Sequence, residues 1–385
     1  MTGSRTRAGR ATRASGPPRP SSGRDPGNVV TMRDIAAASG VSLSTVSRVI
    51  NESPSRVPIA PDTRDRIMRE ALRLGYRPNL FARALRGAPT MLLGAVVRDF
   101  SDPFFAGALE ALAVEAMARG YNIVLGHVQG REQEGLALPA VLEPRRCDAV
   151  IMLGEMEDQP QLLTDLLDAN EPVVALWQGC SPIRFPTVDV DDRKGIAIGL
   201  EHLAQLGHER IGFVSARLPG DNPTREESFI EFMTSRFGSV PDGYLQRCES
   251  TLAGGEAGLQ ALLRLQQPPT AIACSTDVAA VGVLHGAHTH GVAVPDQLSV
   301  VGYDDLMFAP YTVPALTTLR MPTTEIVAEA VRTAIALIAD RSASRAATRM
   351  IFEPTLIVRG STAPPPRGAG LPVTMASGGL QIARL

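Results

Sequence analysis

The sequence has few of the features that mark secreted, membrane or metal-binding proteins. Its four cysteines, Cys147, Cys180, Cys248 and Cys274, form no CxxC pair and no metal-ligand spacing with histidine. This pattern indicates buried thiols in a reducing compartment. No uninterrupted apolar run approaches the roughly 20 residues of a membrane span. The first 28 residues lack the apolar core of a secretory signal. We therefore expect a cytoplasmic protein, with no metal and no cofactor.

Motifs of catalytic sites are missing as well. The sequence contains no GxSxG elbow, P-loop or HExxH, and no GxGxxG follows the first predicted strand. None of the six histidines has a partnered nucleophile in the sequence pattern: His127, His202, His208, His285, His288 and His290. The HTH run at 288–290 is more typical of an exposed helix end than of a metal site. An enzyme on an α/β scaffold is therefore the less favoured class.

Lysine is nearly absent, and the positive charge is unevenly distributed. Lys194 is the only lysine of the 385 residues. Residues 1–90 contain 16 Arg against 6 acidic residues, a charge of about +10, and the remainder has 22 basic against 34 acidic residues, about −12. A basic head on an acidic body is typical of a nucleic-acid-binding segment fused to a different domain. The length accommodates two or three domains.

Residues 31–51, TMRDIAAASGVSLSTVSRVIN, predict two short helices joined by a tight turn. The first would hold small residues that let a second helix cross closely: Ile35, Ala36 and Ala37. Ser39 and Gly40 would form the turn, where Gly can adopt a positive φ, and Ser42 is a fitting N-cap. The pair predicts a helix-turn-helix, with an ordinary αα-hairpin as the alternative.

The second helix of this pair has two different faces. Val46, Val49 and Ile50 fall on the inner face at helical spacing. The other face is short and polar, and its members are Ser44, Thr45, Ser47 and Arg48. Such a face suits base edges and phosphates in a DNA major groove. We therefore expect a DNA reader, and with it a location at the nucleoid.

A third helix and a marginal one follow. Pro61 would open the third helix and Gly75 end it, with an inner stripe of Ile67, Ala71, Leu72 and Leu74. In the run that follows, 76–87, Leu85 lies between Arg83 and Arg86 on a helix too short to be stable alone. Leu85 suits a minor-groove wedge flanked by cations. The alternative is that this segment is a linker helix packed on the body.

From residue 91 the pattern changes to apolar strands alternating with amphipathic helices. The predicted strands are 92–97, 121–126, 148–153, 171–177, 210–215, 270–274 and 298–305, and the clearest helices are 104–119, 196–206 and 278–290. This alternation predicts parallel sheets covered on both faces. The body of about 270 residues is longer than a domain built on one such sheet usually is. We therefore expect two βα lobes facing a cleft, with ligands at the carboxyl ends of the strands.

The head motif is followed in the chain by the runs GYRPNLFARALRG, LGHERIGFVS and LSVVGYDD. With these motifs the chain resembles the lactose/galactose repressor family of bacterial transcription regulators over about residues 30–360. The resemblance implies a small all-α helix-turn-helix head and an α/β two-lobed body like periplasmic binding proteins, with a parallel sheet in each lobe. The predicted domains are a disordered tail 1–28, a DNA-binding domain 29–76, a hinge 77–90, a body 91–360 and a disordered tail 361–385. The first lobe would contain 91–189 and 319–342, and the second 190–318 and 343–360.

The resemblance also implies DNA contacts. Leu43, Ser44 and Arg48 resemble the family's base-reading residues, and Leu85 resembles its minor-groove leucine, beside Arg83. Residues that resemble phosphate and support contacts are Thr31, Ser42, Ser47, Asn51, Thr63, Tyr76 and Asn79. A bidentate contact to guanine suits Arg48, whereas Leu43 offers only methyl contacts.

For the cleft, the resemblance implies a small-molecule effector. The matching residues are Asp102, Phe104, Phe105, Arg225, Thr276, Asp277 and Asp304. Asp277 is equally well explained as a helix cap. For Arg225 and Asp304 ligand contact is favoured over the alternatives, a surface ion pair and a turn cap. Leu252 stands about where sugar binders place an aromatic ring, which leaves modified sugars, glycosides, polyols and nucleobases open.

We therefore predict a homodimeric repressor that binds pseudo-palindromic operator DNA under the control of a sugar-like effector. The two competing classes are an α/β enzyme and an exported solute-binding protein. A solute-binding protein would share the body, but it should begin with a signal peptide and lack the head.

Overall fold

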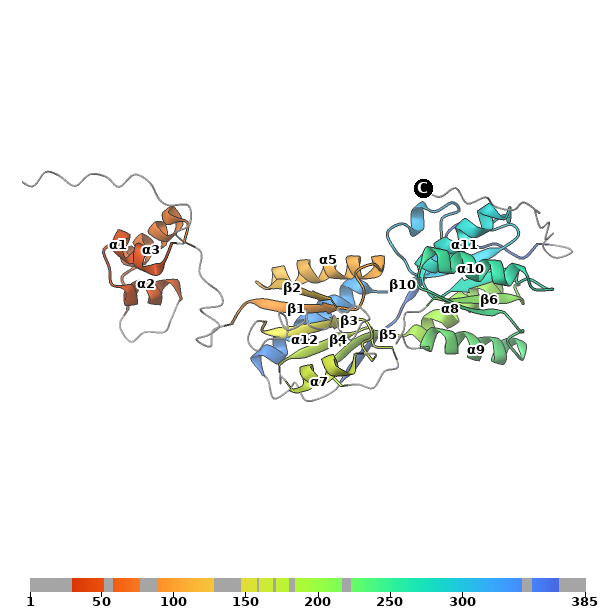
Figure 1. Cartoon of the computed structure of the whole chain (residues 1–385), viewed down its shortest axis with the longest axis horizontal. Helices are drawn as coiled ribbons and strands as arrows, with labels where there is room; N and C mark the ends of the chain where they lie inside the picture. The colour runs from red at the N-terminus through yellow and green to blue at the C-terminus, as the bar shows by residue number, and fades with distance from the viewer. Residues whose placement is uncertain are drawn as a thin grey trace, which may run out of the picture. The chain divides into compact units, whose positions relative to one another are not determined.

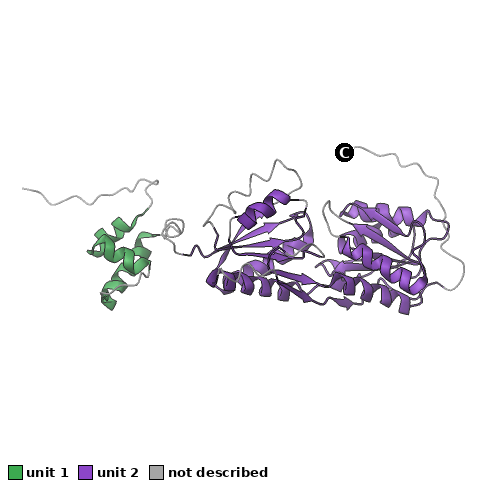
Figure 2. Cartoon of the chain, turned by 90° about the horizontal axis from the view of Figure 1, so that it is seen from below, with its two compact units in different colours: residues 1–83 green, residues 84–385 purple. Residues whose placement is uncertain are grey.

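A computed structural model describes residues 30–51, 58–76, 89–127, 147–157, 159–168, 171–179, 184–216, 223–340 and 348–366. The chain divides into two compact units, Met1–Arg83 and Ala84–Leu385, drawn in green and purple in Figure 2. Asn79, Arg83 and Leu85 of the predicted hinge lie outside the described residues, as do the 1–28 tail and most of the 361–385 tail.

The head consists of three helices, α1 (Met32–Ser39), α2 (Leu43–Ile50) and α3 (Pro61–Leu74). The turn between α1 and α2 has the predicted chemistry, because Gly40 has a φ of 65° and the Ser42 hydroxyl accepts from the backbone N–H of Thr45 at 3.2 Å. Pro61 begins α3, where its missing N–H costs nothing. These local signals confirm the predicted helix-turn-helix.

The core of the head consists of five buried side chains, Ile35, Val46, Val49, Ile67 and Ala71. The predicted inner face of α2 is confirmed, but two predictions were wrong. Leu72 is 85% exposed, since it is about 100° around the helix from the buried Ala71. Ala37 is exposed for the same geometrical reason, being two positions beyond Ile35.

The body contains two six-stranded sheets, each made of parallel strands except for one antiparallel edge strand in the second. The first sheet has the order β11 (Arg349–Phe352), β5 (Thr187–Val190), β4 (Val173–Leu176), β3 (Ala149–Leu153), β1 (Leu92–Val97), β2 (Asn122–His127). The second has the order β12 (Thr355–Ile357), β10 (Thr317–Arg320), β9 (Ser299–Asp304), β8 (Ala271–Cys274), β6 (Ile211–Ala216), β7 (Leu245–Cys248).

Helices cover both faces of each sheet, as Figure 1 shows. Those of the first lobe are α5 (Pro103–Ala118), α7 (Pro160–Asp168) and α12 (Thr323–Ala339). Those of the second are α8 (Asp192–Gln205), α9 (Thr224–Phe237), α10 (Leu252–Leu263), α11 (Asp277–Thr289) and the short η2 (Ala309–Tyr311). Within the described ranges, none of these helices combines the length and hydrophobicity that a membrane span requires.

The chain crosses between the two lobes three times: after β5, after β10 and after β11. The third crossing corrects the predicted lobe boundary, because β11 pairs with β5 in the first sheet and does not belong to the second lobe. All seven predicted strands are present, and the sequence analysis missed β5, β7, β10, β11 and β12. The missed strands have only three or four residues each, too few to show a periodicity.

The start of α8 packs closely on the end of β9. Tyr303 of β9 is fully buried, and Gly195 of α8 lies directly against it. A Cβ atom added at Gly195 would be 2.5 Å from the Tyr303 Oη and 2.8 Å from Cγ of Pro354. The glycine therefore allows α8 to approach the sheet at the edge where the second lobe faces the first.

Replacing Gly195 with Ala should lower the free energy of unfolding by about 1–3 kcal/mol, because the added methyl group overpacks this contact. Urea denaturation of the full chain measures the change. The double variant Gly195→Ala/Tyr303→Phe, which removes the nearest clashing atom, should show a coupling that recovers part of the loss. Equal stability of Gly195→Ala and wild type would contradict the close contact.

Candidate functional site

The first candidate site is the outer surface of α2. Leu43 is 43% exposed and Ser44 is exposed beside it. The Ser42 hydroxyl lies 2.8 Å from that of Ser44, and the Asn51 side-chain amide donates to the Ser47 hydroxyl at 3.1 Å. These short hydroxyl and amide groups gather on one side of α2, opposite the buried Val46 and Val49.

The other predicted DNA residues flank this surface. Arg48 is half-buried in the last turn of α2, and Thr63 in the first turn of α3. Thr31 caps α1, where its hydroxyl and backbone N–H both donate to the Asp34 carboxylate at 2.8 Å. Tyr76 packs against the head core. The structure thus brings eight of the predicted residues to α2 and the ends of its neighbours, and it places Tyr76 partly in the core of the head.

The second candidate site is a pocket between the carboxyl edges of the two sheets. The first lobe contributes residues that follow β1, β3 and β4, and the second contributes residues at the ends of β6, β8 and β9 and at the start of α9. The pocket has about 140 Å³ of space, roughly ten times what one water molecule requires. It therefore accommodates a small molecule that contacts both lobes at once.

Arg225, in the first turn of α9, is the central cation of this pocket. Its Nε donates to Asp192 Oδ1 at 2.8 Å, and its Nη1 donates to the Ser275 carbonyl oxygen at 2.6 Å. The guanidinium lies 3.8 Å from the centre of the Tyr303 ring, a cation–π contact. Among the described residues, Nη2 contacts only the sulfur of Met321, at 3.8 Å, so its N–H groups can donate to a ligand oxygen.

Asp304 supplies the acidic counterpart at the end of β9. Its Oδ1 lies 3.6 Å from Arg225 Nη1, and its side chain is only 6% exposed. Burial raises the pKa of this carboxyl well above its ordinary value, although Arg225 opposes the shift. Its φ of 116° is strained for a residue with a side chain, a feature that clusters at functional sites.

The predicted acidic and hydroxyl residues separate into two groups. Asp102 and Thr276 line the pocket while capping α5 and α11, where they accept from the backbone N–H groups of Phe104 at 2.9 Å and Ala279 at 3.2 Å. Asp277 is fully buried and does not line the pocket. Its two oxygens accept from the Leu306 N–H at 2.8 Å and the Thr318 hydroxyl at 2.5 Å, which ties α11 to the segments after β9 and in β10.

Aromatic rings from the first lobe form one wall of the pocket. Phe104 and Phe105, both predicted, pack edge-to-face on Trp177, with ring centroids 4.8 and 6.4 Å from it. Sequence reasoning missed Trp177, which directly follows β4 and has a strained φ of 54°. Its position after an apolar strand was a usable signal, since ligands bind at the carboxyl ends of such strands.

A buried carboxylate lies just outside the pocket on β5. Asp189 is 2% exposed, its Oδ1 accepts from the Val190 N–H at 3.0 Å, and its Oδ2 is 3.8 Å from Arg349 Nη2. Burial, together with the nearby negative charge of Asp192, raises the pKa of Asp189 to about 7. Sequence reasoning did not find this residue because nothing in the short TVDV run distinguishes it.

Comparison with known proteins gives the same division of the chain. Residues 31–79 match the family model of bacterial regulatory proteins of the lacI family, and residues 200–362 match that of a periplasmic binding protein-like domain. The chain is 32% identical over 338 residues to the HTH-type transcriptional regulator GalR of Salmonella typhimurium, covering 88% of this chain and 97% of that protein.

Two solved structures share the fold. The lac repressor dimer bound to operator and the anti-inducer ONPF is 23% identical, with a TM-score of 0.76 over 87% of this chain and all of that one. The transcriptional regulator CelR in complex with cellobiose is 26% identical, with a TM-score of 0.62 over 86% of this chain and 99% of that one.

The head and the two-lobed body together define a bacterial helix-turn-helix transcription regulator. The chain belongs to the lacI family of bacterial regulatory proteins. The predicted fold class and family resemblance are thereby confirmed. The relatives are regulators of transcription, which at the level of the family fits a protein that is not an enzyme.

The raised pKa of Asp189 predicts that the free energy of unfolding depends on pH. Its pKa is about 7 in the folded chain and about 4 when unfolded, so between these values the folded state holds a proton that the unfolded state releases. This group therefore makes stability fall as pH rises from about 4 to about 7. In Asp189→Asn the fall should be smaller by that contribution.

Urea midpoints at pH 4.5, 6 and 7.5 measure the effect as the difference between wild type and variant. Asp242→Asn, which removes one negative charge at an exposed position, is the matched control. A difference that stays constant across the three pH values would show that Asp189 has an ordinary pKa.

Proposed function

We propose that this protein represses transcription by binding a pseudo-palindromic operator as a homodimer, and that a small neutral effector in the pocket between its lobes releases it. The observation that carries the proposal is the Arg225 pocket. A half-buried cation whose Nη2 can donate to a ligand, an acidic partner and an aromatic wall lie where the two lobes meet, in a chain whose other unit is a DNA reader.

The head supports the DNA half of this function. The exposed face of α2 carries Leu43, Ser44 and Arg48, and a major groove admits a helix of this size. Arg48 is the residue suited to a bidentate contact with guanine. Hydroxyl and amide groups at Thr31, Ser42, Ser47, Asn51 and Thr63 suit phosphate oxygens, which position the head without reading sequence. Leu85 and Arg83 remain the proposed minor-groove pair.

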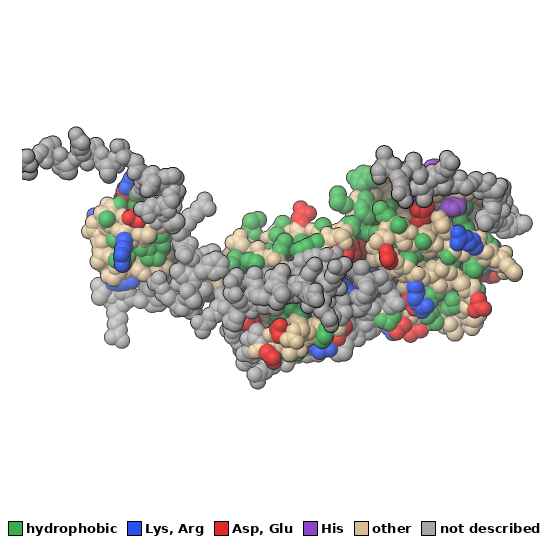
Figure 3. Space-filling model, in the orientation of Figure 1, with side chains coloured by type: hydrophobic (Ala, Val, Ile, Leu, Met, Phe, Trp, Pro, Cys, Tyr) green, Lys and Arg blue, Asp and Glu red, His purple; other side chains and the backbone are tan. Residues whose placement is uncertain are grey.

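Two exposed apolar surfaces of the body support a dimer. On α5, Val114 and Met117 are 57% and 67% exposed, and Figure 3 shows hydrophobic side chains along this helix. After β9, the side chains of Met307, Tyr311 and Val313 are each more than 80% exposed. Apolar surface of this kind on both lobes is typical of an interface, and a twofold pair would cover both surfaces at once.

The mechanism follows from where the pocket lies. An effector that contacts Arg225 and Asp304 in the second lobe and the aromatic wall in the first binds most tightly when the lobes are closed around it. Closure alters the spacing of the two first lobes in the dimer, and with it the spacing of the two heads. The effector thus shifts a population between two states, and its differential affinity limits the shift.

The DNA half is tested with Arg48→Ala. Its affinity for an operator fragment from the chain's own upstream region should fall about tenfold to a hundredfold, the range for one lost bidentate base contact. Gel shifts at fixed salt measure it, since salt changes every such affinity. Arg73→Ala is the matched control, because Arg73 pairs with Glu70 on α3, away from α2.

The effector half is tested with Arg225→Met in the same assay. The variant should still shift the operator fragment but stop responding to any sugar that releases the wild-type protein. If the variant and wild type are released by the same sugar concentration, Arg225 does not contact the effector. If no fragment is shifted by wild type even at low salt, the repressor function itself is refuted.

A further inference from the structure

Trp177, the only tryptophan of the chain, has an unusual position in the pocket. It is 8% exposed, lines the pocket and is held by Phe104 and Phe105 on its flank. Its φ of 54° places the backbone in the left-handed region, which costs about 1–3 kcal/mol for a bulky residue. Such strain is retained where a side chain has to point in one direction.

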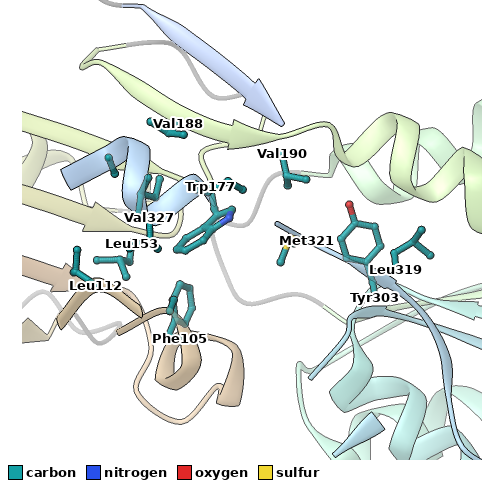
Figure 4. Packing of buried hydrophobic residues seen from close by; sticks show 14 of the residues in the cluster. Phe105, Leu112, Leu153, Trp177, Val188, Val190, Tyr303, Leu319, Met321 and Val327 are labelled. Carbon is teal, nitrogen blue, oxygen red and sulfur yellow. The ribbon is translucent and has the colours of Figure 1, made fainter. Parts of the chain in front are cut away.

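The indole N–H of Trp177 is buried and has no acceptor among the residues that the structure describes. A buried donor without a partner costs about 1–3 kcal/mol, and buried indoles normally have one. Figure 4 shows the indole nitrogen on the side of the ring that faces Met321, and Met321 also lines the pocket. The donor is therefore directed at the place where an effector would lie.

The charges of the pocket determine which effectors suit it. Its described lining contains five carboxylates against two guanidiniums, and these are Asp102, Glu155, Asp192, Glu226 and Asp304 against Arg98 and Arg225. Both cations are already engaged, since Arg98 donates to the carbonyl oxygen of Glu155 and Arg225 lies between Asp192 and Asp304. Glu226 also pairs with Arg247, which leaves four lining carboxylates against the two guanidiniums, so an anionic ligand would meet more negative than positive charge.

We propose that Trp177 selects the effector, and that the effector is an uncharged cyclic polyol, a sugar or glycoside, rather than a phosphorylated or carboxylated one. An apolar ring face of the effector lies on the aromatic wall of Phe104, Phe105 and Trp177, and one of its oxygens accepts from the indole N–H. Its hydroxyl groups reach Asp304 and the Nη2 of Arg225. This inference rests on the proposed function.

The second lobe shows why the first has to supply the ring. Leu252, where an aromatic was expected, is 54% exposed at the start of α10 and does not line the pocket. The described lining from the second lobe contains no aromatic side chain, since Tyr303 lies beneath Arg225 and the other lining residues are polar or aliphatic. Recognition of an apolar face is thereby left to Trp177 and its two supporting rings.

The single indole makes a direct measurement available. Full-length protein is titrated with D-glucose, D-ribose and cellobiose, and with glucose 6-phosphate and ribose 5-phosphate as their charged counterparts, while the tryptophan emission is followed. At least one neutral sugar should change the emission, and its phosphate ester should bind at least tenfold more weakly. A phosphate ester that binds as tightly as its parent sugar, or the absence of any response to the neutral sugars, would overturn the proposal.

Variants of Trp177 distinguish the contribution of the aromatic ring from that of the indole N–H. Calorimetry measures their affinity for the responding sugar. Trp177→Phe keeps a ring but loses the donor, so its affinity should fall about tenfold, and Trp177→Leu should fall further. Phe229→Leu, which removes a buried ring stacked on Phe213 outside the pocket, is the matched control and should keep its sugar affinity.

Operator binding distinguishes this inference from the function on which it rests. Without sugar, both Trp177 variants should still shift the operator fragment, and this affinity is the reference for each variant. If a sugar releases wild type and Trp177→Phe at equal concentrations, the role of Trp177 is refuted and the repressor function stands. If the sugar binds to wild type but leaves operator affinity unchanged, the effector half of the proposed function is refuted and the role of Trp177 stands.

Discussion

The rest of the site depends on the ion pairs and hydrogen bonds that hold the Arg225 guanidinium. A cation partly removed from water needs opposite charges and acceptors around it, and here they come from Asp192 at the start of α8, Ser275 after β8 and Asp304 at the end of β9. The ring of Tyr303 lies beneath it, and Gly195 lets α8 approach that ring. Four elements of the second lobe are therefore fixed around one charge, at the edge that faces the first lobe.

This arrangement explains how one fold can serve as a switch. The second lobe presents charges that are paired with one another, whereas the first presents an aromatic wall in which the Trp177 N–H has no acceptor among the described residues. Neither surface alone encloses a ligand. In our account a polyol bridges the two, so binding is coupled to the relative placement of the lobes, and the three crossing segments after β5, β10 and β11 are the only covalent paths by which the described body transmits that change.

The sequence predicted the parts of this structure that depend on local chemistry. Gly40, Ser42 and Pro61 marked the head helices because a positive φ, a capping hydroxyl and a fixed φ each act within one turn. Arg225 and Asp304 came from the family resemblance, and the structure adds that they face each other. The burial of Asp277, the packing of Trp177 on Phe104 and the pairing of β11 with β5 could not be predicted, because each depends on residues distant in sequence that only the tertiary fold brings together.

The central claim is that effector and operator act on the same equilibrium of this protein. Calorimetry of one responding sugar, with and without saturating operator DNA, tests it most directly. The account predicts that operator weakens sugar binding, and that it does so by the same factor by which the sugar weakens operator binding, within a range of about 5-fold to 150-fold. A sugar affinity that is identical in the presence and absence of operator would contradict it.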